Sequence, residues 1–176
     1  MVCLNPLIQQ VGGLDNIAGM GIGAPNANYY SGCIEMAANI CWAHCVNVPL
    51  AKMFSDALGG LPVRITNDAN AAAMGEMAYG AARGMKNFIV ITLGTGVGSG
   101  IVINGQVVYG HDGFAGELGH VTMVRGSQGR QCGCGRTGCL EAYCSATGVA
   151  RTAREILSTT DRPSLLRNTP AEQIES

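Results

Sequence analysis

The stretch that decides the fold runs Phe88-Ile89-Val90-Ile91-Thr92-Leu93 and passes directly into Gly94-Thr95-Gly96-Val97-Gly98-Ser99-Gly100. The first part is apolar and β-branched and predicts a buried strand. The glycines that follow predict a tight turn with several unhindered backbone N–H groups beside the hydroxyls of Thr95 and Ser99. Such a turn holds phosphate oxygens without a lysine. A glycine-rich turn that binds no ligand can have the same sequence, and the spacing of the glycines alone does not distinguish it from a phosphate-binding turn.

A β-hairpin is predicted immediately after this turn. The segments Ile101-Val102-Ile103 and Gln106-Val107-Val108-Tyr109 flank Asn104-Gly105, the preferred pair for a two-residue hairpin turn. A Rossmann turn would lead into a helix, and a Walker loop would carry Gly-Lys-Ser/Thr. The hairpin instead favours a nucleotide clamp of the strand–turn–strand kind.

Strands and helices alternate along the rest of the chain. We expect strands at 17–23, 62–66 and 121–124, and helices at 50–58, 69–82 and 141–158. In the first of these helices Leu50, Met53, Phe54, Ala57 and Leu58 share one face. The pattern predicts an α/β fold with a mixed sheet. The best candidate for a domain boundary is Gly84-Met85-Lys86, where a completed helix precedes a new run of strands.

The composition is that of a core-forming globular protein. The chain has 176 residues, of which 47% are hydrophobic and 13% charged, and its net charge is -1. The charges are scattered, so no basic patch supports nucleic-acid binding and nothing favours an anionic membrane. The sequence shows neither a run long enough to span a membrane nor the pattern of a signal peptide. We therefore expect a cytoplasmic protein.

The eight cysteines fall into two groups. Cys3, Cys33, Cys41 and Cys45 are spread through an apolar region, and we expect buried free thiols there. The second group lies in a glycine-rich stretch that begins at Cys132. We assign Cys144, the last of this group, to the core as a thiol.

The remaining three cysteines form a metal-ligand pattern with a histidine. Eleven residues separate His120 from Cys132, one separates Cys132 from Cys134, and four separate Cys134 from Cys139. Zinc prefers four nitrogen or sulfur ligands in a tetrahedron, and a full protein set leaves no open position. The pattern therefore predicts a structural zinc site. Reduced free thiols, or disulfides in an oxidising compartment, are the alternatives.

Two further pairs of polar residues are candidates for a binding site. Asn67-Asp68 follows a predicted strand, where ligands bind in α/β sheets, although an Asp before a helix is most often an N-cap. Glu117 and His120 are three residues apart and would share one face of a helical turn. A surface Glu and a buried, hydrogen-bonded His would explain the second pair equally well.

With these motifs assembled, the chain resembles the ROK family (repressors, open reading frames and sugar kinases), and within it the bacterial glucokinases most. The resemblance extends from about Asn16 to Ser158. It rests on Gly19-Met20-Gly21-Ile22-Gly23-Ala24-Pro25, Asn67-Asp68-Ala69-Asn70-Ala71-Ala72-Ala73, Leu93-Gly94-Thr95-Gly96-Val97-Gly98-Ser99-Gly100, Gly116-Glu117-Leu118-Gly119-His120 and Cys132-Gly133-Cys134-Gly135-Arg136-Thr137-Gly138-Cys139-Leu140-Glu141-Ala142.

The resemblance implies the actin-like ATPase, ribonuclease-H-like sugar kinase fold, with mixed sheets in two lobes and a zinc-binding loop. Residues 1–85 would be the C-terminal part of the small sugar-binding lobe, and residues 86–176 the N-terminal part of the large lobe. The implied activity is ATP-dependent phosphorylation of a hexose, first of all glucose to glucose 6-phosphate. Fructose, mannose and N-acetylmannosamine are alternative substrates, and a sugar-sensing repressor is the alternative class. The implied assembly is a homo-oligomer, a dimer or a tetramer.

The family's functional residues map onto the matching motifs. The resemblance implies that Asp68 is the catalytic base, and that the sugar is bound by Asn67, Asp68, Glu117, His120 and Glu141. It implies that ATP phosphates are held by Gly94, Thr95, Gly96 and Gly98. ATP, Mg²⁺ and a structural Zn²⁺ on His120, Cys132, Cys134 and Cys139 are the implied cofactors.

The chain departs from the family pattern at two places. Pro25-Asn26 stands where the family has Pro-Gly, a change that Asn tolerates because it adopts left-handed backbone. Residues 1–16 contain no Asp-x-Gly-Gly-Thr turn, whose Asp helps to position Mg²⁺ in the family, and the region that encloses adenosine would follow Ser176. We therefore expect a chain truncated at both ends that does not turn over by itself.

Overall fold

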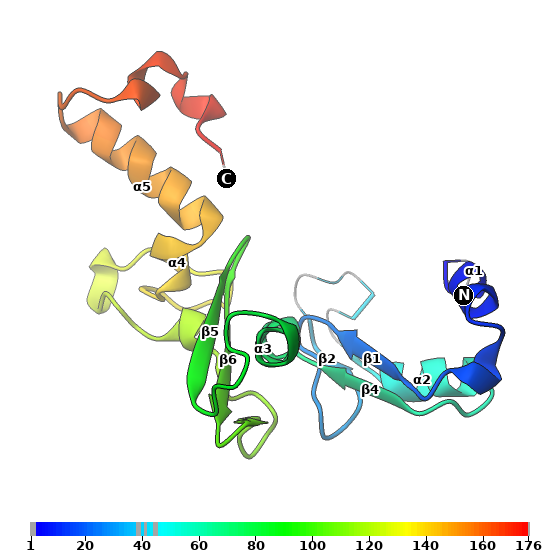
Figure 1. The fold of residues 1–176 in the computed structure, drawn as a ribbon. Coiled ribbons are helices and arrows are strands. Elements are labelled where there is room, and N and C mark those ends of the chain that lie inside the picture. Colours follow the sequence, from blue (N-terminus) through cyan, green and yellow to red (C-terminus); the bar gives the residue numbers. More distant parts are fainter. Residues whose placement is uncertain (1–2, 38–39, 41, 44–45, 176) are drawn as a thin grey trace. The chain divides into compact units, whose positions relative to one another are not determined.

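The computed structural model describes residues 3–37, 40, 42–43 and 46–175 (Figure 1). The chain divides into two compact units. Unit 1 comprises Met1–Phe88 and Ile101–Ala115, and unit 2 comprises Ile89–Gly100 and Gly116–Ser176. The boundary expected at Gly84-Met85-Lys86 and the lobe assignments stay predictions. No helix in the described part of the chain is long and apolar enough to cross a membrane.

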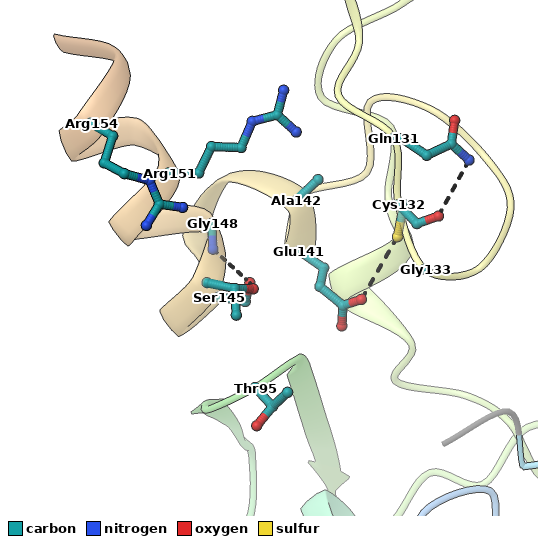
Figure 2. A pocket seen from close by; sticks show the side chains of 11 residues that line it. Thr95, Gln131, Cys132, Gly133, Glu141, Ala142, Ser145, Gly148, Arg151 and Arg154 are labelled. Atoms are coloured by element: carbon teal, nitrogen blue, oxygen red, sulfur yellow. Dashed lines mark hydrogen bonds between the residues drawn. The ribbon is translucent and has the colours of Figure 1, made fainter. Parts of the chain in front are cut away.

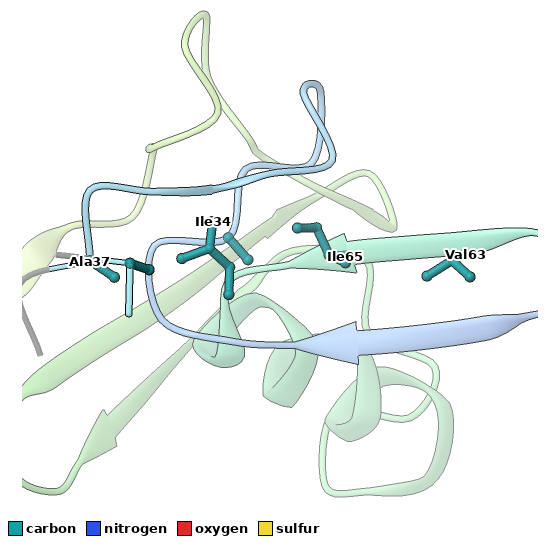
Figure 3. Close-up of a cluster of buried hydrophobic side chains, with 6 residues drawn as sticks. Ile34, Ala37, Val63 and Ile65 are labelled. Carbon is teal, nitrogen blue, oxygen red and sulfur yellow. The ribbon is translucent and has the colours of Figure 1, made fainter. Parts of the chain in front are cut away.

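Unit 1 is built around two parallel strands, β1 (Met20–Gly23) and β4 (Val63–Thr66), with Gly23 opposite Thr66. Helix α2 (Leu50–Ala57) packs on β4, and α3 (Asp68–Tyr79) packs on β1. A short antiparallel pair, β2 (Ile34–Glu35) and β3 (Asn47–Val48), lies nearby in the unit. The buried core consists of Ala27, Ile34, Ala37, Ala43, Val63 and Ile65, and side chains of β1, β3 and α2 pack against it (Figure 3). This core fixes the end of β4, where Asn67-Asp68 begins.

The predicted elements of unit 1 are largely confirmed. Helix α2 matches the expected range, and Leu50 and Phe54 pack against the core, but Met53 is exposed. Helix α3 ends at Tyr79 and not at residue 82, and Gly80 follows it in extended conformation. At the N-terminal end of the unit, the short helix α1 (Asn5–Gln10) and the 3-10 turn η1 (Leu14–Asn16) precede β1.

The cysteines of unit 1 are less buried than predicted. Cys3 is exposed, so the prediction of a buried thiol is wrong there, because the short helix that follows it buries none of its residues. Cys33 is half-buried. Cys41 and Cys45 lie outside the described residues.

The strand–turn–hairpin segment is confirmed with a shorter turn than predicted. Strands β5 (Phe88–Leu93), β6 (Val97–Ile103) and β7 (Gln106–Val107) follow one another in one sheet. Asn104 and Gly105 have φ of 53° and 76°, as a type I′ turn requires. Because β6 already begins at Val97, the turn consists of Gly94–Gly96 alone. Gly98 and Gly100 are strand residues.

The prediction that β5 is a buried strand is wrong. Ile89, Ile91 and Leu93 are 54%, 57% and 65% exposed, while the residues between them are half-buried. Successive side chains of a strand point to opposite faces, so only one face of β5 is covered in the structure.

Unit 2 differs from the prediction in two places. Residues 121–124 form no strand, because the N–H groups of Met123 and Val124 both donate to the carbonyl of Gly138 and leave only an isolated bridge between Thr122 and Cys139. The helix expected at 141–158 is two helices, α4 (Glu141–Cys144) and α5 (Ala146–Thr159).

The break between these helices lies at Ser145. This residue is extended, with ψ of 165°, and its hydroxyl accepts a hydrogen bond from the N–H of Gly148 at 3.1 Å, so it caps α5. Cys144, expected in the core, is half-buried at the end of α4. The 3-10 turns of the unit are η2 (Leu118–His120), η3 (Gly126–Gln128), η4 (Leu165–Asn168) and η5 (Ala171–Gln173).

Candidate functional site

The four predicted metal ligands come together in unit 2. The ligand atoms of His120, Cys132, Cys134 and Cys139 all lie within 4.8 Å of one another. His120 Nδ1 lies 3.7 Å from Cys132 Sγ, and Cys134 Sγ lies 3.7 Å from Cys139 Sγ. Cys132 and Cys139 are buried, His120 is half-buried and Cys134 is exposed.

Local backbone geometry closes the loop around these ligands. The N–H of Cys132 donates to the carbonyl of Arg136 at 2.8 Å, and the N–H of Gly135 donates back to the carbonyl of Cys132 at 3.0 Å. Gly135 and Gly138 have φ of 87° and 79°, a conformation that favours glycine. A Cβ on Gly138 would also overlap the carbonyl of Val124. The glycines are therefore required by the path of the loop itself.

The donor set fits a structural zinc ion. Three thiolates and one imidazole are a typical set of four zinc ligands, and their ligand atoms already lie together in the structure. Burial raises the pKa of the Cys132 thiol to about 12, an effect that a bound cation would oppose. Burial also acts to raise the pKa of Cys134, but hydrogen bonds from the backbone and side chain of Arg136 outweigh it and hold that pKa at about 6.

The second nitrogen of His120 faces a carboxylate. Nε2 lies 3.9 Å from Glu117 Oε2, while Nδ1 faces Cys132 Sγ. The two residues are held by a loop that lies directly on β6. Gly116 and Gly119 allow this approach, since a Cβ on Gly116 would come within 2.6 Å of the Ser99 carbonyl, and one on Gly119 would overlap the Val97 carbonyl.

Glu141 connects two parts of unit 2. One is the loop that carries Cys132, Cys134 and Cys139, here called the metal loop, and the other is the glycine turn Gly94–Gly96. Its Oε2 accepts a hydrogen bond from the N–H of Val97 at 2.9 Å, and its Oε1 lies 3.7 Å from Cys132 Sγ. A Cβ on Gly96 would come within 2.6 Å of the same carboxylate. On the other side of the turn, Gly94 donates to the carbonyl of Gly96 at 3.0 Å and accepts from the N–H of Ala146 at 2.8 Å.

A pocket of about 370 Å³ opens beside this turn (Figure 2). Thr95 lines it from the turn and Glu141 from α4, and the side chains of Arg151 and Arg154 reach it from α5. Arg151 Nε also pairs with Glu155 Oε1 at 2.8 Å, and Arg154 Nη1 donates to the carbonyl of Ile174 at 2.5 Å. The pocket therefore combines two guanidinium groups with one carboxylate.

The two arginines of this pocket were missed in the sequence analysis. Their spacing of three residues on a helical segment places them on one face, and that signal was present in the sequence. This spacing indicates a binding site only once the start of α5 is known to lie beside the turn that contains Thr95.

Asn67 and Asp68 lie in unit 1, at the junction of β4 and α3. The structure assigns the N-cap to Asn67, whose Oδ1 accepts from the N–H of Ala69 at 2.9 Å. Asp68 is the first residue of α3 and is exposed, and its Oδ1 accepts from the same N–H at 2.9 Å. Capping is thus the role of Asn67, and the carboxylate of Asp68 stands at the exposed start of the helix.

Asn26, at the position where the resemblance implies a glycine, adopts left-handed backbone. Its φ is 53°, and its side-chain amide donates to the carbonyl of Glu35 at 3.0 Å. The turn therefore survives the substitution, as the sequence predicted.

The structure brings the predicted site residues together in two sets. Unit 2 contains the glycine turn, the metal ligands, Glu117 and Glu141, and unit 1 contains Asn67 and Asp68. The roles of all these residues as catalytic, sugar-binding or phosphate-binding groups stay predictions.

A family model describes almost the whole chain. The model of the ROK family matches residues 4–174. The chain belongs to the ROK family.

Individual relatives include kinases and a repressor. The chain is 48% identical over 141 residues to a glucokinase of Halalkalibacterium halodurans, covering 80% of this chain and 41% of that protein. It is 37% identical over 142 residues to a xylose repressor of Caldicellulosiruptor bescii, covering 80% of this chain and 34% of that protein. The chain therefore spans less than half the length of these curated relatives.

Among solved structures, a ROK family glucokinase from Streptomyces griseus in complex with glucose and AMPPNP has the same fold. The TM-score is 0.75 at 35% sequence identity, covering 99% of this chain and 55% of that one. This similarity places the chain within the actin-like α/β fold of the ROK sugar kinases.

Proposed function

We propose that the protein to which this chain belongs phosphorylates a hexose with ATP, with glucose as the substrate and glucose 6-phosphate as the product. The observation that carries the proposal is the similarity along 99% of the chain to a glucokinase bound to glucose and an ATP analogue. The 48% identity to a second glucokinase supports it.

In this proposal Asp68 is the general base. As general base, its carboxylate accepts the proton of a sugar hydroxyl as that oxygen attacks the γ-phosphorus. The start of α3 favours a negative charge at this position. The exposed position of Asp68 leaves its carboxylate accessible to a substrate.

The sugar ligands in the proposal are Asn67, Asp68, Glu117, His120 and Glu141. Carboxylates and amide oxygens accept hydrogen bonds from hydroxyl groups, so several of them around one ring distinguish hydroxyl configurations. In unit 2, Glu117 Oε2 lies 3.9 Å from His120 Nε2, and Glu141 Oε1 lies 3.7 Å from Cys132 Sγ, so both carboxylates lie beside the metal cluster.

The phosphate chain of ATP is assigned to Gly94, Thr95, Gly96 and Gly98. Thr95 of this turn lines the same pocket as Arg151 and Arg154, and guanidinium groups are suited to phosphate oxygens. Phosphoryl transfer depends on positioning and charge stabilisation more than on covalent chemistry. Mg²⁺ would accompany ATP. The carboxylate beside this turn belongs to Glu141 and already accepts a hydrogen bond from the N–H of Val97, so we assign Mg²⁺ no ligand in this chain.

Zinc has a structural role in the proposal. Held by His120, Cys132, Cys134 and Cys139, it would stabilise the loop between η2 and α4 and perform no chemical step. Metal on His120 Nδ1 would fix the ring with Nε2 directed toward Glu117.

The test of the proposed function is a coupled assay of ADP formation on the protein that contains this chain. Glucose, fructose, mannose and N-acetylmannosamine are compared, and we expect the highest kcat/KM with glucose. A higher value with another sugar would correct the substrate, and sugar-independent ADP formation would contradict the proposal.

A sugar-sensing repressor is the second candidate, because a xylose repressor matches 80% of the chain. A repressor would bind sugar without forming ADP and would release operator DNA when sugar is added. Electrophoretic mobility shift with and without sugar separates the two candidates. A homo-oligomeric state and a cytoplasmic location stay predictions for either.

A further inference from the structure

Arg130 makes a dense set of contacts with the two helices that follow the metal loop. Its side chain is only 10% exposed. Nη1 donates to the carbonyls of Ala142 and Gly148 at 3.1 and 3.3 Å and to Thr152 Oγ1 at 2.8 Å. Nη2 lies 2.5 Å from Glu155 Oε2, so the nearly buried charge is paired.

These contacts lie where the helical backbone is interrupted. Helix α4 ends at Cys144 because Ser145 is extended, so the last carbonyls of α4 have no partner within that helix. Arg130 donates to one of these carbonyls, that of Ala142, and also to the carbonyl of Gly148 beyond the break. The side chain thus bridges α4 and α5.

The main chain of Arg130 belongs to the metal loop. Its N–H donates to the Tyr143 hydroxyl at 2.9 Å, and its carbonyl accepts from the N–H of Gly138 at 2.8 Å. The guanidinium also lies 4.6 Å from the centre of the Tyr143 ring, a cation–π contact. Cys132, a proposed zinc ligand, follows two residues later.

We propose that Arg130 is a positioning residue that holds the metal loop and Glu141 in one fixed arrangement. Glu141 precedes Ala142, and its carboxylate must reach both the N–H of Val97 and the vicinity of Cys132. The main chain of Arg130 is part of the metal loop, and its guanidinium binds the carbonyls of Ala142 and Gly148. The proposal rests on the assigned roles of zinc and Glu141 in the proposed function.

The planar shape of arginine is part of the inference. Nη1 faces three acceptors, Nη2 faces one carboxylate, and the Tyr143 ring lies against the guanidinium. Together these contacts require donors in a fixed plane, which the ammonium of lysine does not provide. The conservative variant Arg130→Lys should therefore keep the charge but lose the bridge.

The experiment compares Arg130→Lys and Arg130→Gln with Arg125→Gln. Arg125 is an exposed arginine of the same loop region that has no place in either proposed site. Three quantities are measured well below the unfolding temperature: hydrogen exchange of residues 141–148, the rate of zinc transfer to a chelator, and the Kd for glucose of the zinc-loaded protein. A purely structural role would lower Tm but leave the last two quantities unchanged.

We expect the amide hydrogens of residues 141–148 to exchange faster in both Arg130 variants, and those of α3 to exchange at an unchanged rate. We expect zinc release to be roughly tenfold faster and the glucose Kd to rise by a similar factor, as for other residues that orient metal ligands. Exchange and zinc release equal to those of Arg125→Gln would overturn the proposal. If the Arg130 variants fail to fold, Tyr143→Phe decides, because it removes one partner of Arg130 and keeps the ring. It should change the exchange of residues 141–148 in the same direction, and an unchanged rate would overturn the proposal.

The outcomes separate this inference from the proposed function. If the unaltered protein binds neither glucose nor ATP, the proposed function fails, yet hydrogen exchange and zinc release still decide the role of Arg130. If glucose binds and Arg130→Lys changes none of the three quantities, Arg130 has no positioning role and the proposed function stands.

Discussion

The carboxylate of Glu141 accepts a hydrogen bond from the backbone N–H of Val97 at 2.9 Å, across a sequence separation of 44 residues. This contact places a proposed sugar ligand directly over the glycine turn assigned to ATP. The same carboxylate lies 3.7 Å from the proposed zinc ligand Cys132. In unit 2, therefore, a single side chain links the proposed phosphate, sugar and metal sites.

Gly96→Ala should disrupt this link. The new Cβ would come within 2.6 Å of Glu141 Oε2, whereas a Cβ on Gly94 would meet nothing within 4 Å. We expect Gly96→Ala to lower the free energy of unfolding by about 1–3 kcal/mol, the usual cost of overpacking, and to weaken glucose binding. Denaturant unfolding and calorimetric titration measure the two effects. Gly94→Ala is the matched control for stability, and an equal loss in both variants would argue against the contact.

Removal of one zinc ligand should weaken sugar binding without deleting a proposed sugar contact. We expect Cys134→Ala to lose bound zinc and to raise the Kd for glucose by at least about tenfold, because the loop that positions His120 and Glu141 is released. Metal analysis of the reduced protein and calorimetric titration check both results. Cys3→Ala, at an exposed cysteine of unit 1, should retain one zinc per chain. Purified, reduced protein without zinc would contradict the metal assignment.

Asn67 and Asp68 are both proposed sugar ligands, but each should have a second role, structural for Asn67 and chemical for Asp68. Asn67 caps α3, so Asn67→Ala should lower the free energy of unfolding by about 1 kcal/mol. Asp68→Asn keeps the size of the side chain but removes the base, so we expect glucose binding to persist while turnover is lost. Denaturant unfolding and calorimetric titration of each variant measure the difference. Loss of glucose binding in Asp68→Asn would show that Asp68 acts mainly as a sugar ligand.

Glu155 should give a pH-dependent contribution to stability. Hydrogen bonds from Arg151 and Arg130 lower the pKa of its carboxyl below the ordinary value. A carboxyl whose pKa is depressed on folding stabilises the protein above its unfolded pKa, near 4.3, and loses this contribution as pH falls through the lower folded value. The Tm difference between the unaltered protein and Glu155→Gln should therefore be largest at neutral pH and shrink below about pH 4. A constant difference from pH 3 to 7 would contradict the shifted pKa.

Local signals in the sequence predicted the parts of the fold that depend on few residues. Asn104-Gly105 fixed the hairpin because few residue pairs adopt positive φ at both positions. The clustering of His120, Cys132, Cys134 and Cys139 could be predicted from residue type and spacing, because a zinc site requires nitrogen and sulfur donors in sufficient number. Zinc binding by this cluster stays a prediction.

Features that depend on distant partners were not predictable in this way. The break at Ser145 escaped notice because the helical spacing of apolar residues continues across it. Residues 121–124 have the composition of a strand, but their N–H groups are bound to Gly138. The partners of the Arg130 guanidinium lie 12 to 25 residues away, and no local pattern points to them.

The most direct test of the central claim is phosphorus NMR of the protein that contains this chain, incubated with glucose, ATP and Mg²⁺. The account predicts that the signal of the γ-phosphoryl group is replaced by that of glucose 6-phosphate, and that Asp68→Asn forms none. Release of inorganic phosphate without glucose 6-phosphate, or equal product from Asp68→Asn, would contradict it.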